Sequence, residues 1–244
     1  MKTTIQTKLR RPIWNRNQKA ARKVLTGRLR SQEESQKGRF IPSDVDRILD
    51  QAWRNVDDLM PSMPEQKTLG NFHWVFSGLT LLAIYRSLLN EGTAKDYATN
   101  LISDIIWKAY ESLRVIRFIS NSIIRLITSD LHKQLGIQLR LLLSYPYSPP
   151  GYEIDFSSDS DTHYMNIYRC PVLEFYRTQD EEALELFRKT WCVFDYAVAE
   201  VMVKGGRYER LHTLSAGDSV CDMRWFVADN KKTGADAGPS KTEK

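Results

Sequence analysis

The sequence predicts an α+β fold in which an N-terminal helical region is followed by an antiparallel sheet of two hairpins with intervening helices. Apolar residues recur at helical spacing through much of residues 41–143, whereas they alternate with polar ones in short segments of residues 151–228. Helices and strands that cluster along a chain, instead of alternating, favour an antiparallel sheet over a doubly wound parallel one. We expect residues 41–228 to form a single domain.

The helical part is predicted from one-sided apolar patterns. Residues 44–60 carry their apolar side chains on a single helical face and are followed by Pro61, which ends the helix. A second helix is expected from about residue 68 to residue 89 and is stopped by Gly92. Apolar residues at helical spacing then continue as far as Ile127, so this stretch forms either one long helix or two.

The pattern changes after residues 144–151, a linker that contains three prolines and a glycine. Beyond it, apolar and polar side chains alternate, as they do in a strand with one buried face. A helical region at about residues 180–203 separates two pairs of such segments. The four strands are predicted at residues 152–156, 163–170, 207–214 and 219–228.

The positive charge of the chain is concentrated at its N-terminus. Residues 1–40 hold twelve Lys/Arg and two acidic residues, a balance of +10. Because the whole chain carries a net charge of +5, the rest of the chain is net negative. This basic arm is interpreted as a solvated tail or a short docking helix. An organellar presequence is an alternative, and nucleic-acid binding is not expected because the arm has no aromatic platform. We expect residues 1–30 and 230–244 to lie outside the core, with residues 229–244 a disordered tail.

The three cysteines are an odd number without paired spacing, which predicts a reducing compartment and no disulfide. No apolar segment follows the first residues, and the longest apolar stretch, residues 74–85, is too short to span a bilayer. We therefore expect a cytoplasmic protein without a membrane partner. The chain has no P-loop, dinucleotide-binding glycine pattern or zinc-finger spacing, so neither a cofactor nor a metal is expected. Its oligomeric state is not encoded in any pattern of the sequence.

The residues that could carry chemistry gather in the last third of the chain. All three cysteines, Cys170, Cys192 and Cys221, lie there beside charged groups. The neighbouring polar candidates are Arg169, Asp195, Glu209, Arg210, His212, Asp222 and Arg224. Nothing comparable occurs earlier in the sequence.

These positions carry a resemblance to a known family. The run Arg169-Cys170-Pro171, the spacing of Cys192 and Asp195, and the closing series Glu209-Arg210, Thr213-Leu214, Gly217 and Cys221-Asp222-Met223-Arg224 are similar to motifs of the L-2-amino-thiazoline-4-carboxylic acid hydrolases. Met223 stands where that family usually has phenylalanine. The similarity extends over roughly residues 45–228. A fainter likeness is to small-molecule-binding domains of the vinyl-reductase type, which would make the chain a non-catalytic binding module.

The resemblance implies a hydrolase that opens a cyclic amidine, either 2-amino-thiazoline-4-carboxylate or a related intermediate of secondary metabolism. Such a reaction needs a nucleophile, a proton for the leaving atom and an anchor for the substrate carboxylate. Cys170 or Cys221 could attack as thiolate, or Asp195, Glu209 or Asp222 could serve as general base to water. The anionic group of the substrate is expected to bind an arginine, with Arg169, Arg210 and Arg224 as candidates and with Asp222 and His212 nearby.

Each candidate also has a structural interpretation. Cys221 falls on the apolar face of its strand, and Cys192 lies in a largely apolar helix, so both fit a core. Asp222 and Arg224 share the other face of the strand, where an ion pair with Arg210 or His212 would suffice. His163 and His212 fit surface positions on strands. A zinc site built from the three cysteines and His212 matches no compact ligand spacing.

Overall fold

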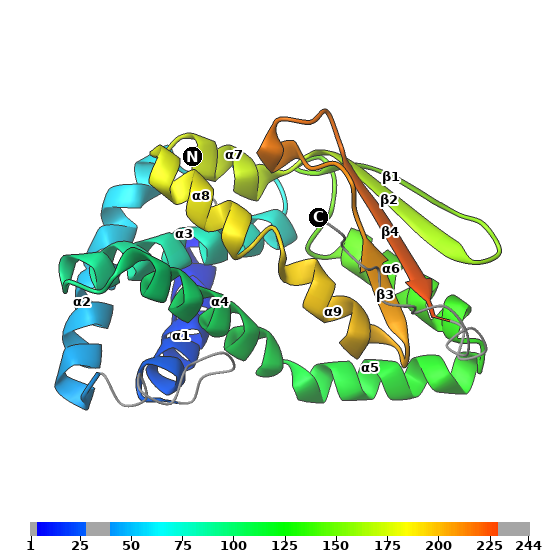
Figure 1. Ribbon diagram of the computed structural model, residues 1–244, viewed down its shortest axis with the longest axis horizontal. Coiled ribbons are helices and arrows are strands. Elements are labelled where there is room, and N and C mark those ends of the chain that lie inside the picture. Colours follow the sequence, from blue (N-terminus) through cyan, green and yellow to red (C-terminus); the bar gives the residue numbers. More distant parts are fainter. Residues whose placement is uncertain (1–3, 28–39, 229–244) are drawn as a thin grey trace, which may run out of the picture.

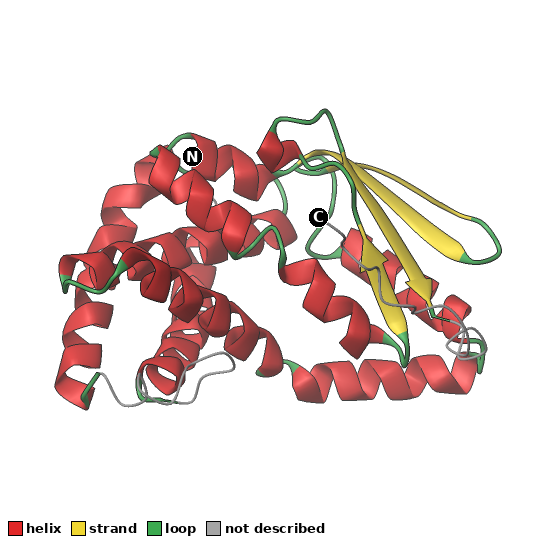
Figure 2. Ribbon diagram, in the orientation of Figure 1, coloured by secondary structure: helices red, strands yellow, loops and turns green. Residues whose placement is uncertain are grey.

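The computed structural model describes residues 4–27 and 40–228, apart from the side chains of residue 4 and of residues 114–117. Figure 2 shows most of the helices gathered on one side of the molecule and the strands together on the other. The predicted α+β fold, with N-terminal helices followed by an antiparallel sheet, is confirmed. The helices are α1 (Thr4–Leu25), α2 (Pro42–Leu59), α3 (Leu69–Asn90), α4 (Lys95–Glu111), α5 (Arg114–Ile127), α6 (Leu131–Ser144), α7 (Pro171–Arg177), α8 (Glu181–Lys189) and α9 (Phe194–Met202).

Helix α3 is the centre of the helical side. It begins where the Thr68 side chain accepts a hydrogen bond from the backbone N–H of Asn71. Apolar residues surround it on all sides, and a helix of that kind is stable only when other elements cover it. It packs against α1, α2, α4 and α7. Its composition would also suit a membrane span, but 78% of its apolar window is buried inside the fold.

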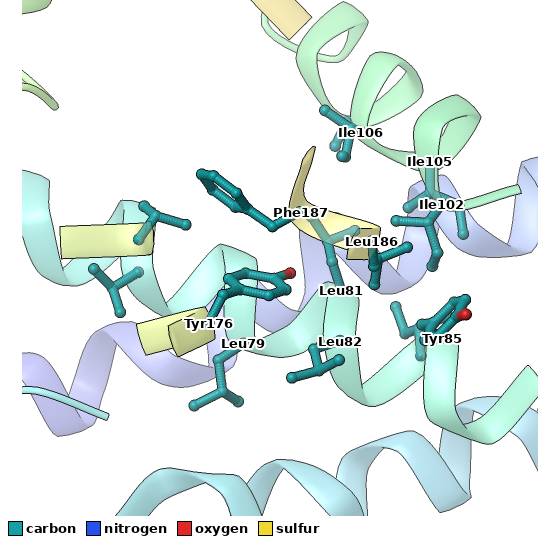
Figure 3. Packing of buried hydrophobic residues seen from close by; sticks show 14 of the residues in the cluster. Leu79, Leu81, Leu82, Tyr85, Ile102, Ile105, Ile106, Tyr176, Leu186 and Phe187 are labelled. Atoms are coloured by element: carbon teal, nitrogen blue, oxygen red, sulfur yellow. The ribbon is translucent and has the colours of Figure 1, made fainter. Parts of the chain in front are cut away.

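The core is contributed by helices far apart in the sequence. Figure 3 shows Leu79, Leu81 and Leu82 of α3 beside Tyr176 of α7 and Phe187 of α8. The Tyr176 hydroxyl donates a hydrogen bond of 2.9 Å to the carbonyl of Gly78, so the buried phenol is satisfied within the core. Helix α3, which precedes the sheet, and helix α7, which lies between its strands in the sequence, are thus in direct contact.

The prediction that residues 1–30 lie outside the core is wrong for α1. Ile13, Trp14, Ala21 and Val24 of this helix are buried, and the helix packs on α3 and α4. The apolar face is interrupted by polar residues that form buried hydrogen bonds, which hides its periodicity. Asn17 donates to the Thr80 hydroxyl across a distance of 2.7 Å. The predictions for residues 28–30 and for the tail beyond residue 228 fall outside the described part of the chain.

The sheet has four antiparallel strands in the order β1-β2-β4-β3. They are β1 (Glu153–Ser158), β2 (Thr162–Arg169), β3 (Gly206–Glu209) and β4 (Cys221–Val227). On the two central strands the buried residues alternate with more exposed ones, and Met165 pairs with Met223 and Ile167 with Cys221. Helix α6 packs against β4 and α9 against β3, and Figure 1 shows α6 and α9 beside the sheet. The two predicted hairpins are present, joined through the β2–β4 pair.

Two predicted elements are shorter than expected. The predicted helix at residues 180–203 is divided into α8 and α9 by a break at residues 190–193. The predicted strand at residues 207–214 ends at Glu209, because the backbone beyond it binds the side chain of a β4 residue, Asp222, instead of the β4 backbone. The N–H groups of Leu211 and His212 donate to Oδ1 of Asp222 at 3.0 and 2.7 Å. Both interruptions place polar side chains around a cavity between the helices and the sheet.

Replacing Trp14 by alanine tests the corrected role of α1. Trp14 is 1% exposed, so we expect the W14A change to lower the free energy of unfolding by about 3–5 kcal/mol. Lys19→Ala is the matched control on the exposed side of the same helix, with an expected change within about 0.5 kcal/mol. Urea denaturation measures both, and equal stabilities of the two variants would contradict the burial of α1.

Candidate active site

A cavity lies where α3, the end of β2, the α8–α9 break and the start of β4 meet. Its volume is about 50 Å³, which at roughly 10–15 Å³ per water molecule is room for about three to five waters. Aromatic side chains line much of the cavity, namely Trp74, Tyr147, Tyr152, Phe187, Trp191 and Phe194. The polar lining consists of Cys170, Cys192, Asp195, Arg210, Thr213, Ser215 and Cys221. The cavity is therefore apolar on most sides, with a few convergent polar groups, as ligand sites usually are.

The polar residues reach the cavity from five separate points of the chain. Cys170 follows β2 and caps α7, where its sulfur accepts the N–H of Leu173 at 3.5 Å. Cys192 lies in the break before α9, and Asp195 in the first turn of that helix. Arg210 directly follows β3. Cys221 is the first residue of β4, opposite Ile167 of β2.

The thiols of Cys170 and Cys221 are kept in their neutral form. Burial raises the pKa of Cys170 to about 12. Burial also raises the pKa of Cys221, although the Thr213 hydroxyl and the N–H of Leu214 oppose the shift. Neither sulfur is a thiolate at neutral pH in the empty site, so direct attack by either one would first need a base.

Two hydroxyl groups link Cys192 and Cys221. The Thr213 oxygen lies 3.5 Å from each of the two sulfurs. Ser215 lies 3.3 Å from the Cys192 sulfur and 3.1 Å from the Thr213 hydroxyl. The group forms a small hydrogen-bonded patch on one wall, which can donate to or accept from a bound ligand.

Asp195 is the acidic residue of the cavity lining. Burial raises the pKa of its carboxyl to about 6, even though the Arg210 charge acts in the opposite direction. Among the described residues, no hydrogen bond or ion pair is formed by its carboxyl oxygens. An acid of this pKa changes its protonation state close to neutrality, which is what a general base requires.

Arg210 brings a positive charge to the same cavity. Its guanidinium donates to the carbonyl of Cys192 at 3.1 Å and stands 6.0 Å from the ring centre of Tyr208. A guanidinium has five N–H donors, so others are left for a ligand. The side chain is half-buried, and a carboxylate there would meet it away from bulk water.

The structure brings five of the candidate residues together, namely Cys170, Cys192, Asp195, Arg210 and Cys221, and leaves the others outside the cavity lining. Arg169 is exposed and forms a two-point ion pair with Glu174, at 2.7 and 3.1 Å. Glu209 and Arg224 lie opposite each other on the exposed face of β3 and β4. They face away from the buried side of the sheet.

Asp222 and His212 organise the loop that carries Thr213. The His212 Nδ1 lies 2.9 Å from Oδ2 of Asp222. Partial burial acts against ionisation, yet the N–H groups of His212 and Leu211 and the His212 ring hold the pKa of Asp222 below its usual value. The expected pairing of Asp222 with His212 is thus present as a hydrogen bond, which becomes an ion pair when the imidazole is protonated. The residue lies in a loop and not on a strand, which corrects its predicted position.

Several lining residues were not among the predicted site residues. Trp74 and Trp191 lie in helical segments whose apolar pattern indicates a core, and Ser215 carries no distinguishing signal. Thr213 belonged to a resembling motif without an assigned role. His163, predicted at the surface, is 5% exposed and stacks on His132 at a ring distance of 4.0 Å.

The three thiols are free in the structure. Within residues 4–27 and 40–228, no group of three or more His, Cys, Asp or Glu side chains is arranged to hold a metal ion. The described cavity thus offers thiols, hydroxyls, one carboxyl and one guanidinium to a ligand. This set suits recognition of a small molecule with an anionic group and proton transfer to it.

Replacing Asp222 by alanine tests its role in the loop. Removal of the carboxylate deprives two backbone N–H groups of their acceptor, so we expect the free energy of unfolding to fall by about 1 kcal/mol. The amides of Leu211 and His212 should also exchange their hydrogens faster. Glu209→Ala, on the exposed face of β3, is the control and should change neither quantity. If the two variants exchange alike, the loop is held by something other than Asp222.

Comparison with known proteins agrees with the motifs seen in the sequence. The family model of L-2-amino-thiazoline-4-carboxylic acid hydrolase matches residues 81–225, which is more than half of the 244-residue chain. No curated protein and no solved structure gives a significant match. All the polar residues of the cavity lie inside the matched region, whereas α1 and Trp74 precede it. The chain therefore belongs to the L-2-amino-thiazoline-4-carboxylic acid hydrolase family.

Proposed function

We propose that this protein hydrolyses a small cyclic amidine that bears a carboxylate, of the 2-amino-thiazoline-4-carboxylate type, in the cavity around Asp195. The observation that carries the proposal is the Asp195 carboxyl, which lies among aromatic rings and thiols with a pKa of about 6. Family membership supports the hydrolase class. We further propose that the reaction takes place in the cytoplasm, since the free thiols suit a reducing compartment.

The proposed chemistry is attack by water with Asp195 as base. A water oxygen bonds to the ring carbon between nitrogen and sulfur while its proton passes to the Asp195 carboxylate and the electron pair of the C=N bond moves to nitrogen. That pair re-forms the C=N bond as the bond from this carbon to the ring sulfur breaks, and the proton goes from Asp195 to the leaving sulfur. The resulting isourea then tautomerises to the urea of the product. The product of 2-amino-thiazoline-4-carboxylate is N-carbamoyl-cysteine, which contains every atom of the substrate and of one water molecule.

The thiols fit this route better as neutral groups than as nucleophiles. Burial holds Cys170 and Cys221 protonated, so they can donate weak hydrogen bonds to a ring atom or to the attacking water. Arg210 is proposed as the anchor of the substrate carboxylate, because it is the cationic residue of the cavity lining. Glu209 and Arg224 have no part in the proposed site, since both lie on the outer face of the sheet.

The direct test incubates the purified protein with 2-amino-thiazoline-4-carboxylate and with the matched cyclic amidine that lacks the carboxylate. Mass spectrometry should show the gain of one water molecule, and a thiol reagent should detect the released thiol. Binding of the compound without ring opening would instead support a non-catalytic binding module. Neither binding nor turnover of any cyclic amidine would contradict the proposal.

Asp195→Asn tests the base. We expect kcat to fall by roughly 10²–10⁴-fold, and the wild-type rate to rise with pH through about 6 as the carboxyl loses its proton. The variant should lose this inflection. Glu200→Gln, an exposed position on the same helix, should keep both rate and profile. An unchanged pH profile in Asp195→Asn would remove Asp195 from the mechanism.

The same variant has a predicted effect on stability. The folded-state pKa of Asp195 is about 6 against an ordinary value of 3.8, so its ionisation costs stability as pH rises from about 4 to about 6. Above pH 6 the full cost is present, and Asp195→Asn removes it. We expect the free energy of unfolding at pH 7.5 to increase by about 1–3 kcal/mol and to be nearly unchanged at pH 4.

Arg210→Gln tests the anchor. Loss of a charge-assisted pair should raise KM for the carboxylate substrate by roughly tenfold to a hundredfold, and should leave KM for its neutral amide nearly unchanged. Arg207→Gln, on the exposed part of β3, is the control with the same change of charge. An equal rise in KM for acid and amide would show that Arg210 supports the fold and does not bind the carboxylate.

A further inference from the structure

A second cavity lies on the other side of the aromatic wall. Trp74, Trp191 and Phe194 line both cavities, and the second one is closed by α1 and α4. Its volume is about 40 Å³ and its lining is mostly apolar. Among the described lining residues Arg16 of α1 is the charged one. Placing a cation beside an apolar, aromatic cavity costs free energy unless the charge has a partner.

Arg16 lacks the partner that neighbouring arginines have. Arg10 and Arg22 of the same helix pair with Asp57 and Asp46 of α2, each at 2.5 Å. For Arg16 the described part of the chain provides one hydrogen bond, from its terminal nitrogen to the Ser77 hydroxyl at 3.3 Å. Its Nε is buried without an acceptor among the described residues. Arg16 lines the cavity, and a guanidinium has five N–H donors, so donors on its terminal nitrogens remain for a ligand.

The described residues around Arg16 do not neutralise its charge. Burial, followed by the charge of Arg16, lowers the pKa of His73 to about 4, so that imidazole is neutral at physiological pH. The His73 ring is hydrogen-bonded to the Tyr145 hydroxyl. Burial also lowers the pKa of Arg16 itself, but a guanidinium stays protonated at any physiological pH. A ligand carboxylate in the cavity would supply an acceptor for the terminal nitrogens of this guanidinium.

We propose that this second cavity binds a small planar carboxylic acid, with its ring against the aromatic wall and its carboxylate on Arg16. The wall of Trp74, Trp191 and Phe194 offers faces and edges on which a planar ring packs well. The site draws Arg16 from α1, which lies outside the matched family region. The second cavity takes part in no step of the proposed hydrolysis, so ligand binding there can be tested independently of that function.

The test measures binding of benzoate and of benzamide by titration calorimetry at pH 7.5. These two probes share their ring and differ in charge. The wild-type protein should bind benzoate at least roughly tenfold more tightly than benzamide, as expected for a charge-assisted pair. Arg16→Gln should bind both with the affinity of benzamide. Lys19→Gln, an exposed lysine on the same helix, carries the same change of charge and should behave as wild type.

Two further variants locate the probe. Ala109→Leu narrows the second cavity alone, because Ala109 lines it and does not line the first, and it should abolish binding of both compounds. Arg210→Gln, which alters the first cavity, should leave the preference for benzoate intact. The proposal is overturned if wild type shows no preference for benzoate, if Arg16→Gln retains it, or if the preference is lost in Arg210→Gln instead. Arg16→Lys, which keeps the charge, should retain part of the preference and so separates loss of charge from loss of packing.

Discussion

The burial of α3 on all of its sides is the constraint on which the rest of the structure depends. A helix with apolar side chains around its whole circumference must be covered from every direction, and α1, α2, α4 and α7 do this. The α7 contact ties the sheet region to the helical side through Val172 and Tyr176, which approach α3 at Gly78. Helix α3 also carries Trp74, whose side chain forms part of the wall shared by the two cavities. The candidate site is thus a consequence of how the central helix is covered.

Burial also determines the ionisation of the polar groups in the site. The same exclusion of water that keeps the thiols of Cys170 and Cys221 protonated raises the pKa of Asp195 toward neutrality. Arg210 keeps its charge because a guanidinium does not lose its proton in a protein. One apolar environment therefore yields a neutral pair of sulfurs, a carboxyl poised to exchange protons and a permanent cation. Those are the elements that hydrolysis of a small anionic amidine needs.

The two arginines that face the cavities come from different parts of the fold. Arg210 belongs to the region shared with the hydrolase family, whereas Arg16 belongs to the helix that precedes it. The arginines of α1 thus have different surroundings: Arg10 and Arg22 pair with carboxylates of α2, and Arg16 lines a cavity. Its excess of positive charge need not reflect a polyanionic partner.

The sequence by itself determined the fold class and the two hairpins. Local pattern suffices for these, because alternation in β2 and β4 directly reports which side chains face the core. Tertiary structure alone decided which charged residues meet. Asp195 and Arg210 converge on Cys170 and Cys221 because a helix break and a strand end happen to lie side by side, and no local pattern encodes that. Likewise, α1 is buried although its composition is basic. Its Asn17 can lie in the core because the side-chain amide donates a hydrogen bond to the Thr80 hydroxyl. Only the packed structure reveals such a partner.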